Sequence, residues 1–276
     1  MAALVDAEFE TAAIAIYTGE LSDLDRELAA RPELVTRRSS VGHPTLLQLV
    51  ACESADLVDP VGAARLLVER GAETWSPVVS AAGCNSVEVL AFLIDSGAAF
   101  DRDDVWTPLE EALYWNSRGT IQVLVDHGAP IRSLGAAAGL GDLETIEAFL
   151  DGDPIRFDAG PIRSPFPATV PDELTNDPQA IVDHAFVMAI NAGQLDAAKR
   201  LHAAGARPNE RPPGYHWHGT ALHAGCWRGD PELVGWLLSI GADPVIRDGL
   251  ADADAAGWAT HHGHPELLQL LQPPRT

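Results

Sequence analysis

The chain has 276 residues, of which 46% are hydrophobic, and its 40 acidic side chains against 18 basic ones give a formal net charge of −22. This apolar content is enough for a substantial core, which excludes a wholly disordered chain. Because basic surfaces hold phosphate groups, neither nucleic acid nor an anionic membrane is predicted as a partner, whereas the excess acid suits a basic protein, a cation or simply a well-solvated surface.

The cysteines and the N-terminus bear on the cell compartment. Cys52, Cys84 and Cys226 show no CxxC spacing, and their odd number leaves one of them out of any disulfide scheme. Reduced thiols in a cytoplasmic protein are therefore predicted. The N-terminal residues reach acids before any apolar run long enough for a signal peptide, and no stretch of the chain approaches ~18 uninterrupted apolar residues. Neither export nor a membrane span is predicted.

Along the chain, Gly-Ala pairs close a series of apolar runs with helical spacing, and the glycines of these pairs are Gly71, Gly97, Gly128, Gly205 and Gly241. Glycine commonly ends a helix because it reaches the left-handed conformation without steric cost. The intervals between the pairs are 26, 31, 77 and 36 residues. The longest interval holds about two units and an insertion, so the period lies near ~33 residues, the length of a helix–turn–helix repeat unit.

The clearest unit spans residues 219–244. It opens with Thr-Ala-Leu-His at 220–223, turns at Gly-Asp and closes with Gly-Ala-Asp at 241–243. In this pattern Thr220 caps the first helix, and Asp230 caps the second, with proline in its first turn. The unit resembles the ankyrin-repeat family, and the resemblance implies that His223 forms a hydrogen bond between neighbouring loops. A second unit opens with Thr-Pro-Leu at 107–109, where Glu110 replaces the histidine.

The resemblance implies an all-α fold: an ankyrin-repeat solenoid of about eight helix–turn–helix repeats with one proline-rich insertion. A single ankyrin-repeat domain is expected to cover residues 1–276. The predicted helix pairs lie at about 6–31, 43–71, 74–98, 105–129, 131–151, 179–206, 217–242 and 250–272. The third and fifth of these repeats are short, and the last one ends in Gln-Pro-Pro-Arg-Thr, as a capping repeat would.

The insertion covers residues 152–178 and interrupts the array. Its six prolines exclude a long helix. Its apolar side chains, among them Ile162, Phe166 and Leu174, are too many for a free linker. We expect this segment to pack back on the solenoid, either over the concave face of the repeats or harmlessly on their outside.

The resemblance also implies a concave face, built from the first helix of each repeat and the loop before it. Two positions just before the turn glycine point into this groove in the family's pattern. Aromatic or charged residues occupy these positions at both ends of the array and in one repeat near its middle, and two more tryptophans lie in the loops. The candidate binding residues are Tyr114, Trp115, Trp106, Trp217, Trp227, Arg228, His261 and His262. Enrichment in aromatic residues is typical of protein-binding hot spots.

Histidines cluster late in the chain, and His216 or His218 could approach His261 across one repeat to bind a zinc-like ion. The alternative is structural, because His223 already has a role in the repeat and no HExxH or CxxC signature is present. No nucleophile elbow, Walker loop or dinucleotide fingerprint appears either. We therefore predict no metal site, no cofactor and no catalytic residue.

The sequence predicts a protein-interaction module that binds a partner protein or peptide, with a basic partner favoured by the charge. The alternative is a small-molecule-binding or enzymatic variant with a pocket beneath the insertion. That pocket would have small residues on its floor, namely Gly83, Cys84, Gly139 and Asn191, and aromatic walls, namely Tyr114, Trp115, Trp227 and His261. Pockets of several hundred Å³ are the usual scale for such ligands.

Overall fold

The computed structural model describes residues 5–40, 42–102, 105–151 and 160–272. Within these ranges every regular element is helical, with fifteen α-helices, six short 3₁₀ helices and no strand. The chain divides into two compact units, Met1–Pro130 and Ile131–Thr276. Both units consist of stacked helix pairs, which confirms the predicted all-α fold of helix–turn–helix repeats.

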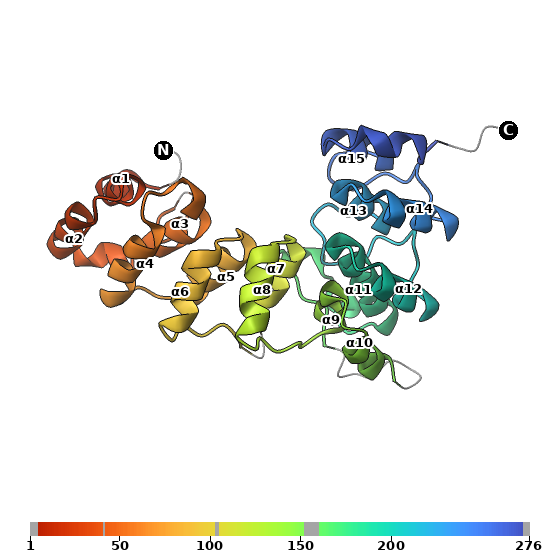
Figure 1. Ribbon diagram of the computed structural model, residues 1–276, viewed down its shortest axis with the longest axis horizontal. Helices are drawn as coiled ribbons and strands as arrows, with labels where there is room; N and C mark the ends of the chain where they lie inside the picture. Colours follow the sequence, from red (N-terminus) through yellow and green to blue (C-terminus); the bar gives the residue numbers. More distant parts are fainter. Residues whose placement is uncertain (1–4, 41, 103–104, 152–159, 273–276) are drawn as a thin grey trace. The chain divides into compact units, whose positions relative to one another are not determined.

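The first unit holds four helix pairs. They are α1 (Glu10–Thr18) with α2 (Leu21–Ala30), α3 (Leu46–Cys52) with α4 (Pro60–Glu69), α5 (Trp75–Gly83) with α6 (Val87–Asp95), and α7 (Pro108–Tyr114) with α8 (Arg118–Asp126). Three 3₁₀ helices accompany them: η1 (Ala7–Phe9), η2 (Pro32–Val35) and η3 (Ser54–Asp56). The first helices α3, α5 and α7 pack side by side in one layer, and α4, α6 and α8 form a second layer (Figure 1).

The second unit has the same two-layer plan. Its pairs are α9 (Leu134–Leu140) with α10 (Leu143–Leu150), α11 (Pro178–Ala192) with α12 (Leu195–Ala203), α13 (Ala221–Arg228) with α14 (Pro231–Ser239), and α15 (Ala255–His261) with the 3₁₀ helix η6 (Pro265–Gln269). Helix α11 lies between α9 and α13, and every residue from 180 to 191 is buried. The second member of the last pair is this short 3₁₀ helix rather than an α-helix.

Every range that the sequence predicted as a repeat contains one of these pairs, to within a residue at either end. The capping residues also act as their types suggest. Thr107 accepts a hydrogen bond from the backbone N–H of Glu110 (3.2 Å), and the Glu110 carboxylate accepts one from the N–H of Thr107 (3.0 Å). Asp230 accepts from the N–H groups of the first turn of α14. Such caps satisfy backbone donors that a helix leaves unpaired at its start.

His223 links neighbouring loops, as the family pattern implied. Its Nδ1 accepts from the backbone N–H of Thr220 at 3.0 Å, and its Nε2 donates to the carbonyl of Ala253, one repeat later, at 3.2 Å. Burial lowers the pKa of this histidine, so the ring is neutral near pH 7 and can act as an acceptor and a donor at once. This imidazole is therefore a structural element of the repeat.

The glycine that ends α14 offers a test of the repeat pattern. Gly241 has φ +90°, and a Cβ built on it would meet no atom within 4 Å. Gly235 inside α14 is equally open but has no positive φ. Replacing Gly241 by alanine is expected to lower the free energy of unfolding by about 1 kcal/mol, because the strain comes from φ alone. The matched change Gly235→Ala should raise it by about 0.5–1 kcal/mol. Urea unfolding of both variants measures the difference, and equal effects would contradict a left-handed turn at Gly241.

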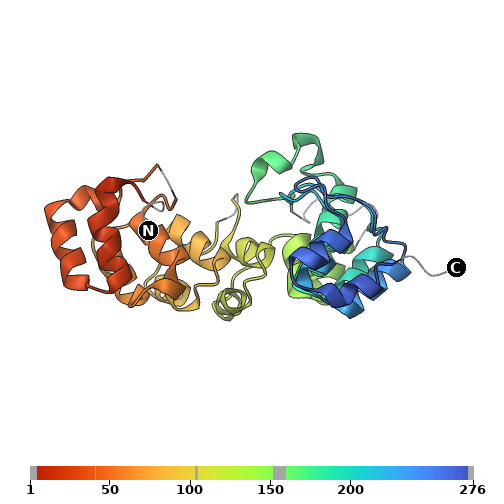
Figure 2. The same cartoon turned by 90° about the horizontal axis from the view of Figure 1, so that it is seen from above.

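The described part of the insertion, residues 160–178, packs against the loop that precedes α13 (Figure 2). It contains two 3₁₀ helices, η4 (Pro167–Thr169) and η5 (Asp172–Leu174). The Ser164 hydroxyl donates to the carbonyl of Gly214 at 2.7 Å, and the Phe166 ring lies 4.7 Å from the ring of His216. Residues 152–159 of the predicted insertion lie outside the described residues. The expectation that the segment packs back on the repeats holds for the part that is described.

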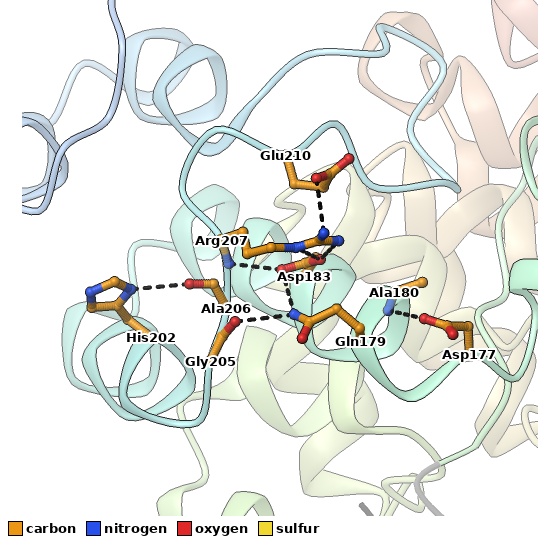
Figure 3. A network of polar contacts seen from close by, with 9 residues as sticks. All are labelled: Asp177, Gln179, Ala180, Asp183, His202, Gly205, Ala206, Arg207 and Glu210. Carbon is orange, nitrogen blue, oxygen red and sulfur yellow. Dashed lines mark hydrogen bonds and ion pairs between the residues drawn. The ribbon is translucent and has the colours of Figure 1, made fainter.

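A polar network ties the start of the same loop to α11 (Figure 3). Asp183 is 1% exposed, and its carboxylate accepts from the backbone N–H of Arg207 at 2.8 Å and from the guanidinium at 2.6 and 3.0 Å. Gln179 donates to the same carboxylate and to the carbonyl of Gly205. Burial raises the pKa of the Asp183 carboxyl, against the lowering effect of Arg207. The loop that carries Trp217 therefore begins from a fixed point on α11.

Candidate functional site

In the first unit, two tryptophans bind one carboxylate at the end of α7. The indole Nε1 groups of Trp106 and Trp115 both donate to Glu111, the second at 2.8 Å. Burial raises the pKa of the Glu111 carboxyl, and the two indole hydrogen bonds oppose that rise. Trp115 is 36% exposed. We call Trp106, Glu111 and Trp115 the Glu111 cluster. It holds an exposed aromatic surface in one orientation, next to a carboxylate.

Tyr114 does not lie on that surface. Its side chain is fully buried, with the Trp106 ring at 6.0 Å and the Trp115 ring at 5.1 Å, both edge to face. The sequence-based assignment of Tyr114 to an open groove is therefore wrong for its side chain. Consecutive residues on a helix point about 100° apart, so Tyr114 turns towards the neighbouring helices while Trp115, the residue after α7, stays at the surface.

The cluster has acidic neighbours along the first-helix layer of this unit. A Cβ built on Gly83, at the end of α5, would lie 2.7 Å from the Glu111 carboxylate, which shows how closely α7 covers that glycine. The Glu53 carboxylate follows α3 and pairs with the His43 imidazole at 2.8 Å. Burial and the charges of Glu53 and Asp56 raise the pKa of Tyr17. This side of the first unit therefore combines negative charge with aromatic rings.

In the second unit, four aromatic rings form a chain that includes three of the predicted site residues. The Trp217 ring lies 5.5 Å from that of Trp227, and the Trp227 ring lies 6.2 Å from that of Trp258 and 5.6 Å from that of His262. The Trp258 indole donates to the buried carboxylate of Asp248 at 2.8 Å, which fixes its plane. Trp227, Trp258 and His262 are partly exposed. We call these three residues the Trp227 cluster.

Trp217 and Arg228 differ from the sequence prediction. Trp217 is 0% exposed and packs against the rings of Tyr215 and Trp258, so this indole belongs to the core and cannot touch a partner. The Arg228 guanidinium donates to the carbonyl of Asn191 at 3.2 Å and lies 3.8 Å from the Asp230 carboxylate. Its side chain is only 16% exposed. The charge of Arg228 is therefore engaged within the unit rather than directed into a groove.

The histidines of the second unit show no metal-ligand arrangement. Among the described residues, no three His, Cys, Asp or Glu side chains are grouped so that they could hold a metal ion. His216 packs on Phe166 and Trp217, and burial lowers its pKa. His262 lies 4.9 Å from the exposed His261, ring to ring, and burial together with His261 and His264 lowers the pKa of His262. The two adjacent histidines present one exposed and one half-buried imidazole.

The predicted pocket floor is only partly accessible. Gly139 and Asn191 are both buried, the first within α9 and the second beneath the Arg228 guanidinium. Gly83 is half-buried under the Glu111 cluster, and Cys84 is exposed. Gly139 and Asn191 are therefore withdrawn from the surface on which the sequence placed a ligand site.

Sequence reasoning missed Glu111, which organises the exposed tryptophan. A signal was present, since Glu111 occurs four residues before Trp115 and five after Trp106, and residues four apart share one side of a helix. It also missed the proximity of Cys52 to Cys84. Their 32-residue separation is nearly one repeat, so equivalent positions of neighbouring repeats could have been compared.

Comparisons with known proteins found one matching family model and similar solved structures. Residues 184–238 match the family model described as "Ankyrin repeats (many copies)". Among solved structures, the crystal structure of the human ASB11 ankyrin repeat domain matches with 20% sequence identity and a TM-score of 0.37, over 84% of this chain and 100% of that one. None of the curated proteins matches. Among the described residues, no helix has the length and apolar character needed to cross a membrane.

Proposed function

We propose that this chain, which is an ankyrin-repeat protein, binds a partner protein or peptide on the side of its first helices. Ankyrin repeats are generally protein-interaction modules, and the fold therefore supports a protein-binding function. The proposal treats residues 1–276 as one array of about eight repeats that works in the cytoplasm. It assigns the binding contacts to the Glu111 cluster in the first unit and to the Trp227 cluster, with His261, in the second.

The observation that carries the proposal is that Trp115 is partly exposed and yet held in one orientation. Its indole is 36% exposed, yet its Nε1 is held by Glu111 at 2.8 Å. A large aromatic side chain that is already oriented loses little entropy when a partner packs against it, which favours binding. Tryptophan is also among the residues most enriched in binding hot spots. Trp115 is therefore the anchor that we assign to the first unit.

The chemistry around Trp115 favours a basic partner. The Glu111 carboxylate beside it is partly buried, which raises its pKa, and Glu53 follows α3 in the same unit. An arginine or lysine side chain could pair with a carboxylate and stack on the indole at once. The formal net charge of −22 would attract such a segment from a distance. We therefore propose an arginine- or lysine-rich peptide segment as the bound element.

Replacing Trp115 by alanine is expected to weaken binding by about 2 kcal/mol, or roughly 30-fold, as for a hot-spot residue. Glu111→Gln keeps the volume and one of the two acceptor oxygens, so it retains one indole hydrogen bond, and it removes the charge. This variant should bind a basic segment more weakly than the wild type and with less dependence on salt, because the ion pair is lost. Isothermal titration calorimetry at two salt concentrations, with basic and charge-reversed peptides, measures both effects.

The controls separate contact from folding. Trp115→Ala should lower the free energy of unfolding by only about 1 kcal/mol, because the side chain is partly exposed, so the variant stays folded during the binding measurement. A partner first has to be captured, so wild-type chain and the Trp115→Ala/Trp227→Ala double variant are compared by affinity enrichment and native mass spectrometry. If both samples captured the same amount of the same partner protein, the two tryptophans would not belong to the binding site. If a small molecule co-purified instead of a protein, the chain would be a small-molecule-binding protein rather than a protein-interaction module.

A further inference from the structure

Two side-chain contacts between the repeat of α3 and the repeat of α5 join residues that are 32 apart. The Gln48 amide Nε2 donates to the Ser80 hydroxyl at 3.3 Å. The Ser54 hydroxyl donates to the Ser86 hydroxyl at 2.6 Å. Cys52 and Cys84 lie between these two contacts with the same offset, the first as the last residue of α3 and the second as the cap of α5. The packing therefore places the two thiols opposite each other.

The two thiols form a polarised pair. The interaction between their side chains raises the pKa of Cys52 and lowers that of Cys84. Burial of Cys84 and the carboxylates of Glu111 and Glu53 oppose that lowering without reversing it. Cys84 is exposed and Cys52 is half-buried. An accessible thiol with a lowered pKa beside a second thiol is the arrangement found in redox-sensitive cysteines.

The third cysteine lacks these features. Cys226 is buried in α13, and burial raises the pKa of its thiol to about 12. It provides an internal reference for an inert cysteine in the same chain. Any reagent that reacts with thiolates should therefore distinguish Cys84 from Cys226 by both access and ionisation.

We propose that Cys52 and Cys84 are an oxidative modification site, at which a hydroperoxide converts the two thiols into a disulfide between neighbouring repeats. Cys84 is the thiol that reacts first, and Cys52 is the resolving thiol. The site lies beside Glu53, which follows Cys52 in the chain, and beside Gly83, which Glu111 covers. If the proposed function is correct, oxidation also changes the spacing of two repeats within the binding face.

The chemistry balances with one hydroperoxide for each disulfide. The Cys84 thiolate attacks one peroxide oxygen, so that an S–O bond forms, the O–O bond breaks, and the departing oxygen is protonated to water or an alcohol. The Cys52 sulfur then attacks the Cys84 sulfenic acid. The S–S bond forms, the S–O bond breaks, and hydroxide leaves as water with the proton from Cys52. The two thiols lose two electrons, and the peroxide gains them.

The test treats the full chain with a small excess of hydrogen peroxide and follows it by intact mass and non-reducing peptide mapping. The wild type and Cys226→Ser should each lose about 2 Da, with residues 52 and 84 joined, and dithiothreitol should reverse the change. Cys52→Ser should stop at a sulfenic acid on Cys84 that dimedone traps. Cys84→Ser should be oxidised by hydrogen peroxide at least about tenfold more slowly than the wild type.

A second measurement needs no variant. In the native wild-type chain, iodoacetamide should alkylate Cys84 at least about tenfold faster than Cys226. Three results would overturn the proposal: over-oxidation of Cys84 with Cys52 left as a thiol, a disulfide that includes Cys226, or equal alkylation rates. None of these readouts uses a binding partner, so failure here is distinguishable from failure of the proposed interaction.

Discussion

Replacing Trp217 by alanine is expected to lower the free energy of unfolding by about 3–5 kcal/mol, the cost of removing a large aromatic side chain from a core. Trp217 is 0% exposed, and its ring lies 4.6 Å from that of Tyr215 and 6.1 Å from that of Trp258. Its loss would leave a cavity where the loop before α13 meets the repeats. Urea unfolding followed by circular dichroism measures the change.

The matched control is Trp227→Ala in the same unit. Trp227 is partly exposed at the end of α13, so its replacement should cost only about 1 kcal/mol. Trp217→Phe should recover much of the loss, because it keeps an aromatic ring in the cavity. If both alanine variants unfolded at the same denaturant concentration, Trp217 would not be a core residue, and its sequence-based assignment to the binding surface would regain support.

The free energy of unfolding is expected to decrease steeply as the pH is lowered below neutrality, because of His184. This histidine lies on α11, stacked on Tyr215 at 4.8 Å, and its Nδ1–H donates to the carbonyl of Pro213 at 2.9 Å. Burial lowers its pKa to about 4, although that hydrogen bond favours the protonated ring. A histidine in an unfolded chain has a pKa of about 6.5.

The sign follows from the proton bound in each state. Between about pH 6.5 and pH 4 the unfolded chain binds a proton at this position that the folded chain does not, so acid favours unfolding. The contribution of neutral His184 is complete above about pH 6.5 and is lost as the pH falls towards 4, for a total on the order of 3 kcal/mol. Urea unfolding between pH 7.5 and 4.5 measures the slope.

His184→Asn is the control for this slope. Asparagine keeps an N–H donor near the position of Nδ1 but cannot be protonated in this range. The variant loses stability at every pH because it fills less volume. Other titrating groups act equally in both proteins, so the difference between their slopes isolates His184. Parallel curves from pH 7.5 to 4.5 would contradict a buried neutral imidazole at this position.

Local signals were enough to predict the helix pairs. The glycines that end second helices have positive φ values, and Thr107 and Asp230 cap helices as their residue types predict. These features depend on residues within one turn of each other, so they can be read from one stretch of sequence. The insertion was also recognisable, because its prolines interrupt a helical pattern that resumes in α11.

The candidate site was predicted less well because exposure depends on distant residues. Tyr114 and Trp115 are adjacent and both aromatic, yet one is buried and the other is 36% exposed. The family's pattern placed Arg228 in the groove, but its guanidinium donates a hydrogen bond to the carbonyl of Asn191, 37 residues earlier. The family's pattern of groove positions carries no information about such partners from neighbouring repeats.

The sequence alone determined that this protein is an array of helical repeats with a proline-rich interruption, because repeat period, caps and turn glycines act over a few residues. The tertiary structure decided which side chains of that array face the solvent. Contacts between neighbouring repeats help to bury Trp217, engage Arg228 and bring Cys52 to Cys84. Burial and pairing of this kind arise only when repeats stack, since each repeat covers its neighbour rather than itself.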